Sequence, residues 1–345
     1  MRKYLLLTGL FCLAGCYSQD PDAPDVSGLY AQPKLTALEK TTADVTKKPN
    51  DAAAHVKLAD EFARLGKIDD ALNEYNKAID LQPTAEGYLH RGTMLAMLHD
   101  HPAAISDLTE AIKRNPKLSA AYYNRALSHE HMVDYKSGLA DLNKVMELTP
   151  NKADVHWNRG RFLLNTGKLE EALADFDKAV SLDAKLTQAY VDRSYVHFLL
   201  GHNEQTIADC TKALSLDKTN AQAYNNRGNV YNQQEKLDQA LADFDKAIQY
   251  DPENAEAFNN RGTAYGKKGE YKKALADFTQ ALKLHPNFST ALRNRGSTYH
   301  YLNDFVKADA DFGRAQKLDP YNIEQIPEAY RILVTDTPKT GSSDN

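Results

Sequence analysis

A unit of 34 residues repeats through most of this 345-residue chain, and this period limits the folds that are possible. Eight copies follow one another within residues 51–320, and the first of them is one residue shorter than the rest. Their boundaries are 52–84, 85–118, 119–152, 153–186, 187–220, 221–254, 255–288 and 289–322. One unit of this size cannot bury its own apolar side, so the copies are expected to stack on one another. Positions within a copy are numbered below from its first residue.

Each copy carries two stretches in which apolar residues recur at helical spacing. In the sixth copy, Tyr224, Gly228 and Tyr231 mark the first stretch, and Leu237 and Phe244 belong to the second. Positions 8 and 20 are small in every copy, which allows two helices to approach closely. Six copies end in a proline, which stops the second helix because proline has no amide hydrogen. Each copy is therefore predicted to form a helix hairpin.

These small, aromatic and proline positions resemble the signature of the tetratricopeptide repeat (TPR). The resemblance implies an all-α fold, a right-handed superhelical solenoid of eight helix-turn-helix repeats whose first helices form the inner wall. A last amphipathic stretch at 323–334 is expected to be a capping helix over the eighth repeat. Residues 335–345 are too polar to join a core and are expected to be a disordered tail.

Arginine occupies position 7 and aspartate position 23 in the second to eighth copies, whereas the first copy has Leu58 and Glu74. Paired charges that recur with a repeat are usually structural. The sequence therefore predicts an arginine–aspartate pair that ties together either the two helices of a repeat or adjacent repeats.

The first 15 residues have the features of a signal peptide: Arg2 and Lys3, then an apolar run over 5–13 that is too short to span a bilayer. Leu13-Ala14-Gly15-Cys16 resembles the bacterial lipoprotein box, in which the signal is removed and Cys16 is acylated, for example with palmitate. Such a protein is anchored by lipid, and Tyr17 is typical of sorting to the outer membrane, facing the periplasm. An ordinary signal peptide or a buried N-terminal helix is the alternative. Residues 16–50 are rich in proline and polar residues, which favours a flexible tether, although a short helix at 36–47 is also possible.

The composition argues against nucleic-acid binding and against catalysis. Without the signal peptide, 47 acidic residues face 40 basic ones, so a phosphate backbone would be repelled. The sequence has no glycine-rich phosphate loop, no nucleophile elbow and no zinc-type cysteine spacing. Two His-x-His segments, at His99–His101 and His129–His131, offer too few ligands for a metal site. We therefore expect no enzyme activity, no cofactor and no bound metal.

Position 6 is asparagine in five copies, and the resemblance implies that it faces the inner groove. An amide side chain both donates and accepts, so it can bind the backbone of an extended peptide, as similar asparagines do in other members of the family. Aromatic neighbours would supply specificity, and the only tryptophan, Trp157, is the best anchor. The predicted groove residues are Asn124, Asn158, Asn226, Asn260, Asn294, Tyr123, Trp157, Tyr195 and Phe198. In the alternative interpretation, asparagine is merely tolerated at position 6, and Trp157 packs against the next repeat.

The sequence as a whole predicts a lipid-anchored scaffold or adaptor of the bacterial cell envelope that binds a peptide or a partner helix. The second hypothesis is a structural subunit of a permanent envelope complex, or a homo-oligomer, that uses the same surface. The fifth copy departs most from the others, and alanine and lysine replace the terminal prolines on its two sides, at Ala184 and Lys218. We expect lower local stability there and a hinge between two halves.

Overall fold

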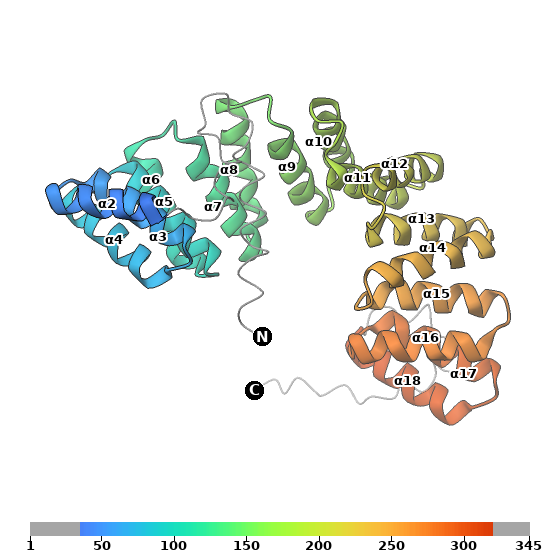
Figure 1. The fold of residues 1–345 in the computed structure, drawn as a ribbon. Helices are drawn as coiled ribbons and strands as arrows, with labels where there is room; N and C mark the ends of the chain where they lie inside the picture. The colour runs from blue at the N-terminus through green and yellow to red at the C-terminus, as the bar shows by residue number, and fades with distance from the viewer. Residues whose placement is uncertain (1–34, 320–345) are drawn as a thin grey trace, which may run out of the picture. The chain divides into compact units, whose positions relative to one another are not determined.

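The computed structural model describes residues 35–319 (Figure 1). This part of the chain forms seventeen α-helices and no strand. The chain divides into two compact units, residues 1–184 and 185–345, which are described separately below. The expected signal peptide, the lipidated Cys16, the capping helix at 323–334 and the tail at 335–345 lie outside the described residues.

The first unit begins with a single helix and continues with four helix hairpins. Its helices are α2 (Leu35–Lys47), α3 (Ala52–Arg64), α4 (Ile68–Leu81), α5 (Ala85–Met97), α6 (His101–Arg114), α7 (Ser119–His131), α8 (Tyr135–Leu148), α9 (Ala153–Asn165) and α10 (Leu169–Leu182). Each hairpin packs against the next through its second helix, as α4 does against α5 and α6 against α7.

The second unit contains the other four hairpins. Its helices are α11 (Thr187–Leu199), α12 (Asn203–Leu216), α13 (Ala221–Gln233), α14 (Leu237–Tyr250), α15 (Ala255–Lys267), α16 (Tyr271–Leu284), α17 (Ser289–Tyr301) and α18 (Phe305–Leu318). Figure 1 shows these hairpins stacked in chain order from α11 to α18. In both units the first helix of a hairpin begins where the sequence copy begins.

Each hairpin is held closed by an aromatic ring that lies against a small residue. A Cβ added to Gly228 would lie 2.7 Å from Cε1 of Phe244 in the same hairpin. The side chain of Phe244 is fully buried, which stabilises the fold by about 1.5–3 kcal/mol. Gly160 and Phe176 meet in the same way in the fourth repeat. Position 8 is small because a larger side chain would overlap the ring.

The predicted arginine–aspartate pair joins the two helices of one repeat. In repeats two to eight, Nε and one Nη of the arginine donate to the two carboxylate oxygens over 2.6–2.8 Å, and the aspartates are only 3–6% exposed. The pairs are Arg91–Asp107, Arg125–Asp141, Arg159–Asp175, Arg193–Asp209, Arg227–Asp243, Arg261–Asp277 and Arg295–Asp311. The hydrogen bond from Arg261 to Asp277 is the main reason that the pKa of Arg261 is raised. These residues are structural, and the pair does not link adjacent repeats.

The first repeat replaces this pair with a histidine and a glutamate. Nδ1 of His55 lies 2.5 Å from Oε2 of Glu74, and its Nε2 lies 2.9 Å from the carbonyl oxygen of Pro49. Leu58 fills the position of the arginine and is buried. The second helix of the repeat is thus tied to the chain segment that precedes the first helix.

The turn inside each hairpin contains one residue in the left-handed backbone region. Position 15 has φ between 57° and 77° in all eight repeats. Four of these residues are glycines, which adopt this conformation freely, and the others are His99, Val133, Glu235 and Asn303. Val133 is the unfavourable case, because a β-branched side chain clashes with its own backbone there.

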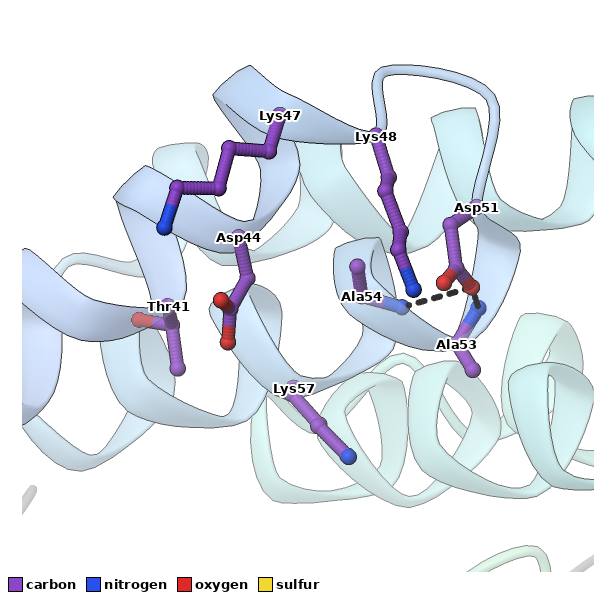
Figure 2. A pocket seen from close by; sticks show the side chains of 8 residues that line it. All are labelled: Thr41, Asp44, Lys47, Lys48, Asp51, Ala53, Ala54 and Lys57. Carbon is purple, nitrogen blue, oxygen red and sulfur yellow. Dashed lines mark hydrogen bonds between the residues drawn. The ribbon is translucent and has the colours of Figure 1, made fainter.

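Helix α2 departs from the flexible tether expected over residues 16–50. Residues 35–47 contain no proline or glycine, and they form a helix that packs against α3, in agreement with the alternative of a short helix at 36–47. Asp51 begins α3 and accepts hydrogen bonds from the amides of Ala53 and Ala54 (Figure 2). A pocket between the two helices is lined by Thr41, Asp44, Lys47, Lys48, Asp51, Ala53, Ala54 and Lys57.

Within residues 35–319, no helix is both long enough and apolar enough to cross a membrane.

Candidate peptide-binding surface

The first helices of successive repeats lie next to one another in each unit. Helices α3, α5 and α7 contact in sequence in the first unit, as do α11, α13, α15 and α17 in the second. The residues at positions 2, 5, 6, 9, 12 and 13 of these helices were predicted to face the groove. Two surfaces of different chemistry result, one in each unit.

Trp157 is the centre of the surface in the first unit. Its indole is partly exposed, and the guanidinium carbon of Arg161 lies 5.2 Å from the ring centroid, a cation–π contact. Arg161 also donates to Glu130 of the preceding repeat over 2.7 Å and to Oδ1 of Asn158 over 3.2 Å. Trp157 is therefore held in place by its own repeat and by the one before it, while part of its ring stays accessible.

Tyr123 and Asn158 belong to the same cluster but lie beneath its surface. Tyr123 is 8% exposed, and its hydroxyl accepts a hydrogen bond of 2.7 Å from Nδ2 of Asn158, which is 3% exposed. Nδ2 of Asn158 also donates to the carbonyl of Asp154. These two side chains support the tryptophan from below rather than presenting polar atoms to a ligand.

The five asparagines at position 6 all donate a hydrogen bond to the preceding repeat. Nδ2 of Asn124 donates to Oγ1 of Thr93 over 2.8 Å, and that of Asn226 donates to Oγ of Ser194 over 3.1 Å. Nδ2 of Asn260 and of Asn294 reaches the Oδ1 of the asparagine at position 5 one repeat earlier, over 3.0 and 2.9 Å. Asn124, Asn158 and Asn226 are buried, whereas Asn260 and Asn294 are partly exposed.

This arrangement differs from the expected open amide row. Position 6 points at the joint between two first helices, so its amide finds a partner in the chain itself. A bound peptide would have to share or displace these hydrogen bonds, and their role in binding stays a prediction.

Helix α11 carries the apolar part of the surface in the second unit. Tyr195 is 41% exposed and Leu199 is 44% exposed, and Phe198 between them is partly buried. Their spacing of three and four residues places these side chains on one side of the helix. Tyr195 and Phe198 are thus placed as a docking surface requires.

The remaining repeats of this unit present a polar wall. Hydrogen bonds link Asn294 to Asn259, Asn259 to Asn260, and Asn260 to Asn225, so four amides form a chain across three repeats. Arg293 is only 5% exposed, and it donates to the hydroxyls of Ser289 and Thr290. This wall is internally satisfied and rigid.

Arg161 and Glu130 were not singled out from the sequence. Both lie at groove positions, 9 and 12, and Arg161 follows Trp157 by one helical turn. That spacing was the available signal for the cation–π contact.

Comparison with known proteins identifies the repeat. Family models described as TPR or tetratricopeptide repeat match residues 35–86, 56–119, 153–186, 210–242, 228–269 and 255–288, which together cover more than half of the chain. This chain is a tetratricopeptide-repeat protein.

Relatives of known sequence and structure agree with this assignment at the level of the fold. The human protein called tetratricopeptide repeat protein 13 is 30% identical over 95 residues, which are 28% of this TPR chain and 11% of the human protein. The present chain thus spans about a tenth of the length of that relative.

Two solved structures support the all-α repeat architecture. A TPR protein from Parabacteroides merdae superimposes with a TM-score of 0.58 at 19% identity, over 72% of this chain and 98% of the solved one. The Cut9–Hcn1 hetero-tetramer of the APC/C gives a TM-score of 0.60 at 15% identity, over 76% of this chain and 52% of the solved one. At these identities the likeness shows the fold alone.

The one cysteine of the TPR repeats is not an accessible nucleophile. Cys210 is fully buried in α12, and burial raises the pKa of its thiol to about 12. The thiolate is the reactive form, so Cys210 acts as a small apolar side chain, as expected.

Proposed function

We propose that this TPR protein is a scaffold that holds a segment of a partner protein against the first helices of its repeats, while a lipid on Cys16 keeps it at the bacterial cell envelope. Proteins of this fold bind other proteins, and no chemistry of substrate turnover is needed. The partner segment is an extended peptide or a helix. The proposed place is the outer membrane, on the periplasmic side.

The observation that carries the proposal is the partly exposed, pre-positioned Trp157. Arg161 and the Tyr123–Asn158 pair hold the indole in one orientation, so a partner loses little by ordering it. Aromatic side chains held in this way are typical centres of binding energy. The exposed apolar residues of α11 supply a second contact of the same kind.

Site-specific crosslinking tests this proposal. A photoreactive amino acid at Trp157, or at Tyr195, is expected to crosslink the same envelope protein in the native host. The matched control is Lys178, which is exposed on the second helix of the repeat that contains Trp157. Crosslinks that are equally strong from Lys178 would contradict binding along the first helices.

Localisation needs a test of its own. Acylation of Cys16 predicts that the chain is found in the membrane fraction and that Cys16→Ser moves it to the soluble fraction. A Cys16→Ser variant that stays with the membrane would exclude a lipid anchor at this residue. It would leave the peptide-binding proposal intact.

A further inference from the structure

The two histidine segments, which seem separate in the sequence, meet in the first unit. His99 and His101 flank the turn between α5 and α6, and His131 is the last residue of α7. The rings of His101 and His131 are stacked, with centroids 4.2 Å apart and planes 8° apart. The ring of His99 lies 5.9 Å from that of His101 and 6.3 Å from that of His131. Three imidazoles from two repeats thus form one cluster.

The repeat itself imposes this proximity. His101 is at position 17 of the second repeat, and His131 is at position 13 of the third. The same two positions in the seventh and eighth repeats hold Tyr271 and Tyr301, which stack with centroids 5.5 Å apart and planes 7° apart. The contact between these positions is therefore a property of the fold, and histidine at both of them, with His99 beside them, is particular to this joint.

The three rings are available as ligands. His99 and His131 are exposed, and neither ring has a hydrogen bond or an ion pair among the described residues. Nδ1 of His101 is buried and has no hydrogen-bond partner. Burial, followed by the neighbouring His131 and His99, lowers the pKa of His101, which favours the neutral imidazole that binds metals.

The spacing of the rings suits a shared ion. Two imidazoles bound to one tetrahedral ion at about 2.0–2.1 Å have ring centres roughly 5 Å apart. The three observed separations, from 4.2 to 6.3 Å, lie on both sides of that value. With the rings stacked, no three histidine, cysteine or acidic side chains within 35–319 are arranged around an ion. The exposed rings of His99 and His131 would have to turn toward His101.

We propose that His99, His101 and His131 bind one divalent transition-metal ion that prefers imidazole, such as Zn²⁺, Ni²⁺ or Cu²⁺. The ion would join the turn of the second repeat to the first helix of the third. The site forms by rotation of side chains, with water in the fourth position of a tetrahedral ion.

Titration of the full-length chain, without a histidine tag, with Zn²⁺ tests the proposal. Calorimetry is expected to give one ion per chain, and the ring proton resonances of all three histidines are expected to shift in NMR spectra. Each of His99→Asn, His101→Gln and His131→Gln is expected to weaken binding at least about tenfold, since even outer-shell changes at metal sites cost that much. Asparagine is suitable at position 99 because Asn303 has the same left-handed backbone at the equivalent turn.

The pair His197 and His202 provides the control. Their Nδ1 atoms lie 3.3 Å apart, but only two rings are present. A His197→Gln, His202→Gln variant should keep the Zn²⁺ affinity of the unaltered chain. Binding that survives all three changes of the cluster, that disappears in the control, or that appears only at millimolar Zn²⁺ would overturn the proposal. The exposed His99→Asn variant, with an unchanged melting temperature, separates loss of a ligand from loss of folding.

Discussion

At the scale of single residues, the glycine at position 8 is required by the aromatic ring that it faces. We predict that Gly228→Ala destabilises the protein by about 1–3 kcal/mol, because the added Cβ would lie 2.7 Å from the buried ring of Phe244. Gly313→Ala is the matched control. It lies inside α18 with nothing within 4 Å of an added Cβ, so it should stabilise by about 0.5–1 kcal/mol. Urea unfolding of both variants checks the opposite signs.

The arginine–aspartate pair makes a second prediction at this scale. Arg227→Leu leaves the carboxylate of Asp243, which is 6% exposed, without its bidentate partner. A cost of about 3 kcal/mol is expected from the unpaired buried charge. The double variant Arg227→Leu, Asp243→Leu should recover most of that loss, because an apolar pair needs no counter-charge, and Leu58 already fills this position in the first repeat. Equal stability of the single and double variants would contradict this interpretation.

At the scale of the structural element, the turn between α7 and α8 stores strain at Val133. A β-branched residue at φ 59° costs about 1–2 kcal/mol relative to glycine. Val133→Gly should therefore raise the melting temperature. Gly167→Val, at the same position of the next repeat, should lower it. Thermal unfolding that is unchanged in both variants would show that the turns relax without cost.

The contact between the first and second repeats predicts a dependence on pH. Burial alone would lower the pKa of His90, but its hydrogen bond of 2.7 Å to Asp60 and the charge of that residue outweigh burial, so the pKa of His90 is raised. Folding therefore favours the protonated form. The stabilisation is complete below the ordinary pKa of histidine and is lost as pH rises through the raised value.

His90→Gln should remove this part of the pH dependence. Urea unfolding of the parent and the variant between about pH 5 and 8 measures it, around the ordinary histidine pKa of about 6.5. The difference in stability between them is expected to shrink as pH rises. A constant difference would contradict the role of the His90–Asp60 pair.

At the same scale, the sequence predicted the elements better than it predicted the surface between them. The 34-residue period located the start of each first helix, from Ala52 to Ser289, because the apolar spacing and the terminal prolines act within one copy. It also predicted that each arginine of position 7 meets an aspartate. The environment of position 6 depends on the preceding repeat, whose residues at positions 5 and 9 vary. The buried state of Asn124 and Asn158 could not be derived from their own copies.

The histidine cluster illustrates the same limit. His99–His101 and His131 are about 30 residues apart, and only the packing of position 17 against position 13 of the next repeat brings them together. The role of Arg161 was missed because its partners, Glu130 and Trp157, come from two different repeats. Helix α2 was left open because a short polar stretch with a few apolar residues suits either a tether or a helix.

At the scale of the whole molecule, the chain divides into two compact units at residues 184 and 185. This division coincides with Ala184, where other copies have proline, and it precedes the unusual fifth copy. We predict that hydrogen exchange is faster in α11 and α12 than in α9, α10, α13 and α14, as expected of a hinge. Uniform protection across the fourth to sixth repeats would contradict a hinge in the fifth.

The placement of each arginine–aspartate pair within one repeat has a consequence for how such a chain can change its length. Deleting or duplicating one complete copy removes or adds both partners together, so no orphan carboxylate is left in the interior. A cut out of register, between positions 7 and 23, would strand one of them. Growth and shrinkage of this protein by whole copies, as through unequal recombination, is therefore tolerated by its electrostatics, and the reach of its binding face can evolve in steps of 34 residues.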